Sequence, residues 1–235
     1  MKIGFIGIEL EEGKVKFNDK NLNALEKKDK PKKVTPFFAE FVQDKSDLHE
    51  ELAQVDAIII PQESILDLLI LDIEKLEIRL ERAENEVEQK LLQTALDKLE
   101  EEIPLCDAGF NPEDETIILS AAPFSLKPVI QINGDEESDD LIDQVLQKTG
   151  YMFFYTTGPS ESHAWLVKKG SDIITCAAKI HSDLARGFIK GDVVDFDDYL
   201  ECHNFNECKS KGIARVVDRD YVVQANEIIE IRFNV

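Results

Sequence analysis

The chain of 235 residues lacks three features that would assign it to common classes of protein. No apolar run approaches the roughly 20 residues that a membrane-spanning helix needs, which predicts a protein with no membrane contact. The N-terminus lacks a basic segment followed by a long apolar stretch and a cleavage site, so we expect a cytoplasmic protein. The four cysteines are scattered without a paired framework, which indicates reduced structural thiols rather than disulfides.

Positive charge is also scarce, because 27 Lys and Arg residues face 48 Asp and Glu residues and the net charge is −21. Lys and Arg supply most of the non-specific affinity for nucleic-acid phosphates, so this balance argues against a broad DNA-binding surface. The imbalance is concentrated in residues 63–115, which contain 5 basic and 17 acidic residues, whereas residues 150–235 contain 10 and 13. Only the C-terminal region therefore leaves room for a local basic face.

A strand-like opening over residues 1–8 is followed by Gly13-Lys14, the dipeptide that closes a phosphate-binding loop of the pattern G-x-x-x-x-G-K-[ST]. Five residues separate Gly7 from Gly13, and Val15 occupies the position of the hydroxyl that holds magnesium. The intervening residues include three carboxylates: Glu9, Glu11 and Glu12. Like charges about 4 Å apart repel by roughly 1 to 4 kcal/mol, so these carboxylates oppose a triphosphate. We expect Gly7, Gly13 and Lys14 to form a degenerate phosphate loop.

The N-terminal half predicts a small sheet of α/β type. Four segments are rich in β-branched and aromatic residues or form short apolar runs: residues 2–8, 34–42, 55–60 and 127–132. The stretch from 45 to 54 has apolar residues at helical spacing. The last of the four strands returns to the sheet after a long excursion.

That excursion is helical, because apolar residues recur at alternating three- and four-residue steps between Leu66 and Ile103. One unbroken helix would be roughly 58 Å long, which is too long for a small domain to cover. We therefore expect an antiparallel hairpin that turns near residues 83–86, although no glycine or proline marks the turn. Two interpretations stay open: a solvated acidic hairpin that packs on its neighbour, and an arm that docks a partner.

Residues 151–235 are punctuated by glycine and rich in predicted strands. The expected strands are residues 151–156, 163–167, 215–217, 221–223 and 228–233, with one helix near 175–180. An acidic run at 135–140 precedes this region and opens a helix that Gly150 closes, as the helix dipole favours. The pattern predicts a compact mixed sheet that grips a helix.

Blocks of this region resemble the TGS domain (DUF933 type) that closes Obg-like ATPases of the YchF subfamily. The blocks occur in order as Phe153–Pro159, Ala164–Gly170, Ala177–Asp183, Gly187–Ile189, Asp220–Gln224 and Ile231–Val235. The resemblance covers about 85 residues and implies a β-grasp, ubiquitin-like fold.

The remainder resembles the same family in truncated form. The matching segments are Met1–Gly7, Lys16–Asn18, Val55–Ile59 and Leu71–Arg82. The resemblance implies three parts. Residues 1–62 and 116–149 form a degenerate nucleotide-binding α/β domain of the P-loop type, residues 63–115 form an acidic helical, coiled-coil hairpin inserted in it, and residues 150–235 form the TGS-like β-grasp domain.

Family members recognise the nucleotide base with Asn-x-x-Glu after a strand, and Asn133-Gly134-Asp135-Glu136 follows the strand that ends at 132. The Asp-x-x-Gly switch is represented only by residues 43–46, without glycine, and no glycine occurs between Gly13 and Gly109. Phosphoryl transfer depends mostly on positioning and charge stabilisation. The combined losses predict a chain that is not an enzyme and that needs no cofactor, a pseudo-ATPase.

The other constellations carry weaker predictions. Cys202, His203 and Cys208 do not supply the four well-spaced ligands of a structural zinc site, so we expect no metal. If the ribosome association of the family carries over, a face of the TGS-like domain contacts RNA or a ribosomal protein. The candidate residues of this face are Trp165, Lys168, Lys169, Lys179, His181, Arg186, Phe188 and Lys190. A packed tryptophan beside an ordinary solvated charged face is the alternative.

Two functions of different classes follow. The first is a non-catalytic interaction protein that binds a translation-related or regulatory partner, a protein or the ribosome, through the TGS-like domain. The alternative is an atypical ATP- or GTP-binding protein, or an ATPase, that retains base recognition through Asn133 and Glu136 and binds adenine or guanine nucleotide weakly. A TGS-based sensor of a small ligand is a third hypothesis that the sequence neither supports nor excludes.

Overall fold

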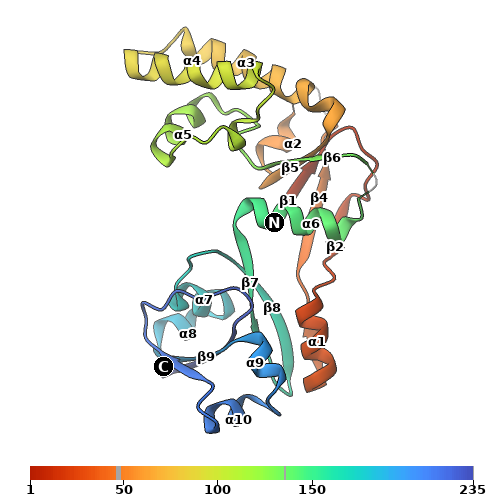
Figure 1. Ribbon diagram of the computed structural model, residues 1–235, viewed down its shortest axis with the longest axis vertical. Helices are drawn as coiled ribbons and strands as arrows, with labels where there is room; N and C mark the ends of the chain where they lie inside the picture. Colours follow the sequence, from red (N-terminus) through yellow and green to blue (C-terminus); the bar gives the residue numbers. More distant parts are fainter. Residues whose placement is uncertain (46–48, 135, 235) are drawn as a thin grey trace. The chain divides into compact units, whose positions relative to one another are not determined.

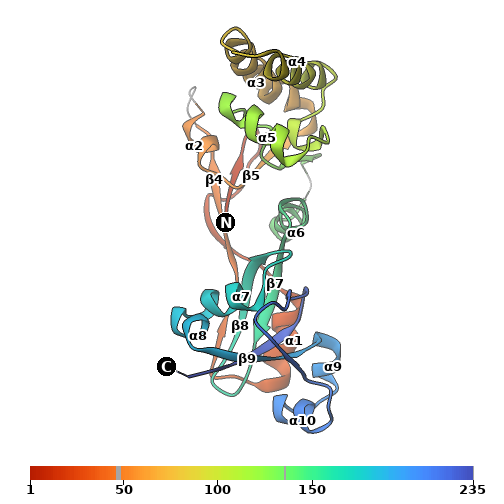
Figure 2. The same cartoon turned by 90° about the vertical axis from the view of Figure 1, so that its left-hand side faces the viewer.

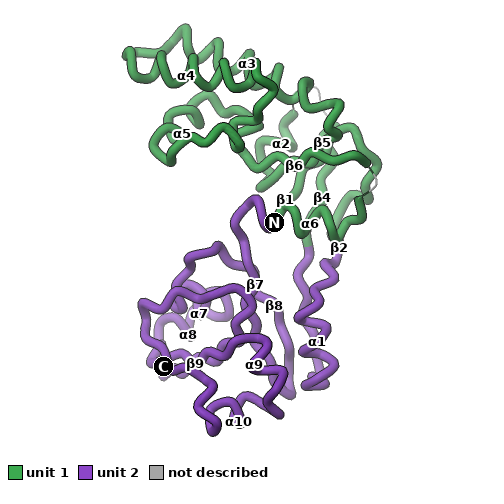
Figure 3. Tube along the Cα trace, viewed as in Figure 1, with its two compact units in different colours: residues 1–15, 39–145 green, residues 16–38, 146–235 purple. Residues whose placement is uncertain are grey.

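The computed structural model describes residues 1–45, 49–134 and 136–234, and it divides into two compact units (Figures 1 and 3). Unit 1 comprises residues 1–15 and 39–145, and unit 2 comprises residues 16–38 and 146–235. Each unit is built around its own sheet. This division differs from the expected one, because residues 16–38 belong with the C-terminal unit.

The sheet of unit 1 has the strand order β2-β4-β1-β5-β6. Its strands are β1 (Lys2–Phe5), β2 (Gly13–Lys16), β4 (Phe38–Gln43), β5 (Ala57–Pro61) and β6 (Val129–Ile132). β1 pairs in parallel with both β4 and β5, and β5 pairs in parallel with β6. Every residue of β5 is buried, as its uninterrupted apolar run predicts for a central parallel strand.

The helical part of unit 1 contains two long helices that lie side by side rather than one (Figure 1). Its helices are α2 (Glu50–Ala53), α3 (Ile65–Leu80), α4 (Glu86–Glu100) and α5 (Pro112–Ile118), with the 3-10 turns η1 (Gln62–Ser64), η2 (Leu105–Asp107) and η3 (Leu119–Ala121). Asn85 starts α4, because its side-chain oxygen accepts a hydrogen bond from the Glu88 amide at 2.9 Å. Leucines of α3 and α4, among them Leu76 and Leu92, share one buried cluster.

The sheet of unit 2 is mixed and has the order β10-β9-β11-β7-β8-β3. Its strands are β3 (Lys33–Thr35), β7 (Tyr151–Thr156), β8 (Glu161–Lys168), β9 (Phe188–Val194), β10 (Arg215–Val217) and β11 (Ile228–Phe233). β7 and β8 form an antiparallel hairpin, and β11 lies parallel to β7 and antiparallel to β9. β3 pairs in parallel with β8, which joins an N-terminal segment to this sheet.

Helices cover both faces of the unit 2 sheet (Figure 2). They are α1 (Lys20–Asp29), α7 (Ile173–Ile180), α8 (Ser182–Arg186), α9 (Phe196–Leu200) and α10 (Phe205–Ser210). The preceding helix α6 (Ser138–Thr149) begins in unit 1 and ends in unit 2. Phe154 of β7 packs with α7 in one buried cluster. Phe153 points to the opposite face, because neighbouring strand residues alternate. There it stacks on Phe17 with ring centroids 5.8 Å apart.

The structure corrects several expected elements. The predicted strand 34–42 is two strands, β3 and β4, which end and begin around Pro36 and enter different sheets. Proline has no amide hydrogen for a strand ladder, so the interruption falls there. Residues 221–223 form no regular strand, and Val222 makes a single isolated bridge to Asp172. The C-terminal region holds α7 to α10 rather than one helix, and β9 is an additional strand.

Candidate functional site

The loop after β1 is the predicted phosphate loop. Gly7 has a φ of +69° and Gly13 a φ of +116°, so both adopt backbone conformations that favour glycine. Gly13 and Lys14 open strand β2, so the element after the lysine is a strand and not the helix that follows a phosphate-binding loop. Glu12 pairs with Lys45 at 2.6 Å, and this hydrogen bond lowers the pKa of the Glu12 carboxyl.

The predicted base-recognition residues lie in the turn after β6. The Glu136 carboxylate accepts hydrogen bonds from the amides of Asn133 at 3.0 Å and Gly134 at 2.9 Å. Glu136 therefore folds back on its own turn, while Asn133 is exposed. Asp135 of this motif and Ser46 of the expected switch lie outside the described residues.

The structure brings these two predicted segments of unit 1 to one edge of the sheet. β1 and β6 both run parallel to β5, so the loop after β1 and the turn after β6 leave the sheet at the same edge. β5 lies between them, which separates the two strand ends by about 10 Å. Ligands of open parallel sheets bind outside the carboxyl ends of the strands.

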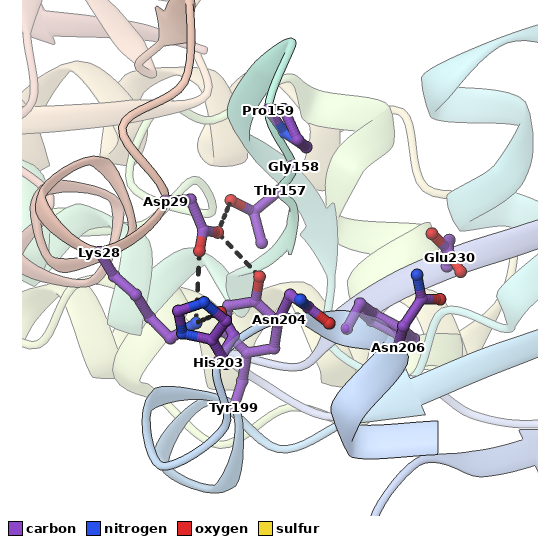
Figure 4. Close-up of a pocket in the computed structure, with 11 residues that line it drawn as sticks. Lys28, Asp29, Thr157, Gly158, Pro159, Tyr199, His203, Asn204, Asn206 and Glu230 are labelled. Atoms are coloured by element: carbon purple, nitrogen blue, oxygen red, sulfur yellow. Dashed lines mark hydrogen bonds and ion pairs between the residues drawn. The ribbon is translucent and has the colours of Figure 1, made fainter. Parts of the chain in front are cut away.

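Unit 2 contains a cavity of about 430 Å³ (Figure 4). This volume lies within the range of small-molecule sites. The cavity is lined by Lys28, Asp29, Thr157, Gly158, Pro159, Tyr199, His203, Asn204, Phe205, Asn206 and Glu230. These residues come from the end of α1, the β7–β8 turn, the α9–α10 segment and β11.

Asp29 is the polar centre of one cavity wall (Figure 4). Its Oδ2 atom accepts hydrogen bonds from Thr157 Oγ1 at 2.6 Å and Tyr199 Oη at 2.8 Å. Lys28 Nζ lies 3.3 Å from Asp29 Oδ1, donates to the His203 carbonyl at 3.2 Å and sits 4.0 Å from the centre of the Tyr199 ring. Burial and the Asp29 hydrogen bond both raise the pKa of Tyr199, which therefore stays a donor. Asp29 thus ties three separate segments together.

The start of α10 organises another part of the cavity lining. Asn204 caps this helix by accepting the Glu207 amide at 3.0 Å, and the Glu207 carboxylate accepts the His203 amide at 2.5 Å. Tyr199 and Phe205 supply aromatic surface, with ring centroids 6.1 Å apart. The cavity therefore combines aromatic surface with an amine, an imidazole and amides, a set that suits a polar ligand or an inserted partner side chain.

Two of the predicted basic residues of unit 2 lie on strands that are not neighbours in the sheet. β8 carries Lys168 and β9 carries Lys190, and these strands are three strand spacings apart in the sheet, about 14 Å. Lys190 pairs with Asp218. Lys168 donates to the Thr149 carbonyl at 2.9 Å and lies over the Tyr151 ring.

The remaining predicted face residues lie in three settings. Arg186 pairs with Asp183 at 2.9 Å, and the Asp183 amide donates to His181 Nδ1 at 3.1 Å. Lys169 and Lys179 are exposed. Phe188 is buried in the core, with 5% of its surface exposed, so it cannot belong to a binding face unless the core opens.

Trp165 forms an aromatic pair that the sequence does not reveal. Its ring stacks on His163 with centroids 3.5 Å apart, and its Nε1 donates to Thr156 Oγ1 at 2.9 Å. Burial lowers the pKa of His163, although nearby Glu161 opposes this shift. Both residues of the pair are half buried.

Within the described residues, no group of three or more His, Cys, Asp or Glu side chains is placed to hold a metal ion. Cys202 and Cys208 are free and buried, and burial raises the pKa of Cys208 to about 12. Of the helices in the described ranges, none combines the length and the apolar character of a membrane span.

Sequence comparison finds a family match in unit 2. The family YchF-GTPase_C, described as "Protein of unknown function (DUF933)", matches residues 151–234. Obg-like ATPase 1 of Xenopus laevis is 35% identical over 127 residues, which is 48% of this chain and 32% of that protein. Ribosome-binding ATPase YchF of Bacillus subtilis is 38% identical over 104 residues, which is 43% of this chain and 28% of that protein. The chain spans about a third of the length of the curated relatives it matches.

Structure comparison finds the same fold in a solved protein. The structure titled "Structure of the Schizosaccharomyces pombe YchF GTPase" superposes with a TM-score of 0.82, covering 99% of this chain and 97% of that chain at 16% identity. This similarity supports the mixed α/β fold with two sheets.

These names contradict the prediction that the chain is not an enzyme. The curated relatives are named ATPases, and the superposed structure is named a GTPase. The prediction rested on departures from short consensus motifs. A consensus motif describes one way of placing a few phosphate-binding groups. A sequence that departs from the motif can still belong to a family of ATPases.

Proposed function

Because the chain belongs to the YchF family of Obg-like ATPases, we propose that it associates with the ribosome and that unit 2 makes this contact. The family match over residues 151–234 carries the proposal, since it falls within unit 2. Two relatives named ribosome-binding ATPase, from Bacillus subtilis and Mycoplasma genitalium, match 43% and 40% of the chain. A cytoplasmic location belongs to the same proposal.

Unit 2 supplies the fold for this contact as a TGS-type β-grasp domain. Its order supports this assignment: the β7–β8 hairpin is followed by α7, then by β9 and β10, and the last strand β11 lies parallel beside β7 in the middle of the sheet. Helix α7 packs on one face of this sheet. The rigid sheet holds the surrounding loops and helices in a fixed arrangement, which is what a recognition surface needs.

The proposed contact uses the exposed lysines Lys169 and Lys179. In the part of the chain that the structure describes, neither forms an ion pair, so both are available to phosphates. Their ammonium groups would neutralise RNA phosphates and release counterions, which makes the affinity fall with salt.

Co-sedimentation with purified ribosomes at about 50 and 200 mM salt tests the proposal. We expect the wild-type chain to pellet with ribosomes at low salt and less at high salt. Lys169→Glu with Lys179→Glu should lower the salt slope by about 2 and weaken pelleting, whereas Lys90→Glu with Lys98→Glu in α4 should change neither. A wild-type chain that stays in the supernatant at low salt would refute ribosome association.

A second function, nucleotide binding at the carboxyl edge of the unit 1 sheet, is favoured by one observation. The loop that contains Gly7 and Lys14 and the turn that contains Asn133 leave the sheet at the same edge. In this proposal Asn133 contacts the base, Glu136 leaves its own turn to join it, and Lys14 contacts phosphate.

Thermal-shift titration with ATP, GTP and adenosine tests this second function. A ligand at about 100 times its Kd adds roughly 2.7 kcal/mol of stability, which is a rise of several degrees in Tm. Asn133→Ala should abolish the rise with all three ligands, Lys14→Ala should reduce it for ATP and GTP but not for adenosine, and Gln131→Ala should leave it intact. Phosphate release measured in parallel reports turnover. No rise with any nucleotide would refute the binding.

A further inference from the structure

The outward face of α3 exposes large aliphatic side chains in unit 1. Leu66, Ile70 and Ile78 are 45%, 52% and 52% exposed. The opposite face of the same helix is buried, with Leu69 and Leu76 at 1% and 0% exposure. The exposed positions span about 18 Å along the helix axis, so they form a strip and not an isolated contact.

At its Ile78 end this strip borders a hollow that Lys75, Arg79 and the exposed Arg82 also line. Five exposed carboxylates flank the strip along its length: Glu63 in η1 and Asp67, Glu74, Glu77 and Glu81 along α3. None of these five forms an ion pair in the described parts of the chain. The basic residues of α3 that lie nearest are engaged elsewhere: Lys75 donates to the Ala122 carbonyl at 2.9 Å, and Arg79 to Ser120 Oγ at 3.0 Å.

We propose that this α3 face, defined by Leu66, Ile70 and Ile78 with the five carboxylates, docks a Lys- and Arg-rich amphipathic helix of a partner protein. Leu66 and Ile70 are one turn apart and present a ridge that fits between the side chains of a second helix. The aliphatic side chains lose water on docking, and the carboxylates pair with the basic residues that border the partner's apolar stripe.

Charge excludes the other occupants. A second copy of this face would bring two sets of five carboxylates together, and like charges across an interface oppose association. Anionic lipid surfaces and nucleic acids carry the same sign and are repelled for the same reason. A basic partner is attracted by the negative potential of these carboxylates, so we expect its association to be fast and sensitive to salt.

Fluorescence anisotropy with the full chain tests the apolar half of the proposal. The probe is a labelled Leu/Lys peptide of about 18 residues, with leucines at helical spacing, which is long enough to form a helix. We expect saturable binding that Leu66→Gln with Ile70→Gln weakens about tenfold or more. Ile189→Gln, which replaces a residue of similar exposure (54%) in unit 2, should leave the affinity unchanged.

Two matched triple variants test the contribution of the carboxylates to docking. Asp67→Asn with Glu74→Gln and Glu77→Gln should weaken binding and flatten its salt dependence. Asp197→Asn with Asp198→Asn and Glu201→Gln removes the same number of exposed carboxylates from unit 2 and should not. Equal loss in both triple variants, or equal binding of a scrambled peptide without an apolar face, would show non-specific attraction and overturn the proposal.

Size-exclusion chromatography tests whether a second copy of this chain occupies the α3 face. A dimer that disappears in Leu66→Gln with Ile70→Gln would overturn the proposal in favour of self-association. Ribosome co-sedimentation of the same variant separates this inference from the proposed function, because the α3 face lies in unit 1. Loss of peptide binding with unchanged pelleting leaves the unit 2 contact standing.

Discussion

Among the described residues, one aspartate of each unit is completely buried, and the two aspartates are stabilised in different ways. Asp72 on α3 in unit 1 accepts hydrogen bonds from the backbone amides of Phe124 and Ser125, both at 2.6 Å. Asp192 on β9 in unit 2 is held by side chains, with Arg232 donating at 2.7 and 2.5 Å and Lys209 at 3.1 Å. Neutral backbone donors serve the first carboxylate, and cations serve the second.

The same burial therefore moves the two pKa values in opposite directions. Burial dominates at Asp72 and raises its pKa, because the backbone amides offset only part of the desolvation. At Asp192 burial acts in the same sense, but the hydrogen bonds from Arg232 and Lys209 outweigh it and lower the pKa. Backbone amides therefore stabilise the buried Asp72, whereas ion pairs stabilise the buried Asp192.

The largest expected effect follows removal of the unit 1 acceptor. Asp72→Ala leaves the amides of Phe124 and Ser125 buried without partners, and each such group costs about 1–3 kcal/mol. We expect the free energy of unfolding to fall by roughly 3 kcal/mol or more, measured by urea denaturation with far-UV circular dichroism. Asp67→Ala, on the exposed face of the same helix, should stay within about 0.5 kcal/mol.

Asp192→Ala should lower the free energy of unfolding by less than Asp72→Ala does, by about 1–2 kcal/mol, although the Asp192 side chain is just as buried. The difference arises because Arg232 and Lys209 keep 50% and 30% of their side-chain surface exposed and can regain water. The fluorescence of Trp165, the only tryptophan, follows unfolding of unit 2 in urea. A cost above that of Asp72→Ala would break the comparison, since it would mean that the cations cannot rehydrate.

The pH dependence of the free energy of unfolding distinguishes the two aspartates further. Each unit by which folding shifts a pKa changes this free energy by about 1.4 kcal/mol. The pKa of Asp192 is lower in the folded state, so its contribution is present above the unfolded value near 3.9 and is lost as the pH falls through the folded pKa. The pKa of Asp72 is raised, so its contribution is present below about 3.9 and is lost as the pH rises through the folded pKa.

Urea midpoints between about pH 3 and 7 measure these slopes. On acidification, the stability difference between wild type and Asp192→Asn should shrink, and the difference between wild type and Asp72→Asn should grow. If both stability differences changed in the same direction with pH, one of the two carboxylates would not have the hydrogen-bond partners described above.

Much of the fold could be predicted from the sequence where local pattern and pairing agree. β7, β10 and β11 have the expected bounds, because each is a short run rich in apolar, β-branched or aromatic residues between turn signals. β9 was not predicted because Gly191 and Asp192 interrupt its apolar run. The buried charge of Asp192 is tolerable there because Arg232 and Lys209, distant in sequence, pair with it. Which sheet β3 joins depends on β8, a partner more than a hundred residues away along the chain. No local sequence pattern encodes such a pairing.

The candidate sites show the same limit. The two segments of unit 1 that are predicted to bind nucleotide could be located in advance at strand ends, because each follows a recognisable strand. The cavity of unit 2 could not, since Asp29 and Tyr199 meet across 170 positions of sequence. The basic residues of unit 2 were expected to form a face, and this stays a prediction, because local sequence does not encode the sheet order that sets β8 and β9 three strand positions apart.

The smallest expected effect concerns an ion pair of unit 2 that lies on the surface. Arg186 and Asp183 pair at 2.9 Å with side chains 72% and 41% exposed, so water competes for both charges. Arg186→Gln should change the free energy of unfolding by less than about 0.5 kcal/mol, and added salt should shrink that difference further because it screens exposed charges. Trp165 fluorescence in urea again provides the measurement. An effect as large as that of Asp192→Ala would mean that exposure does not decide the strength of ion pairs in unit 2, because these two pairs differ mainly in whether the carboxylate is buried.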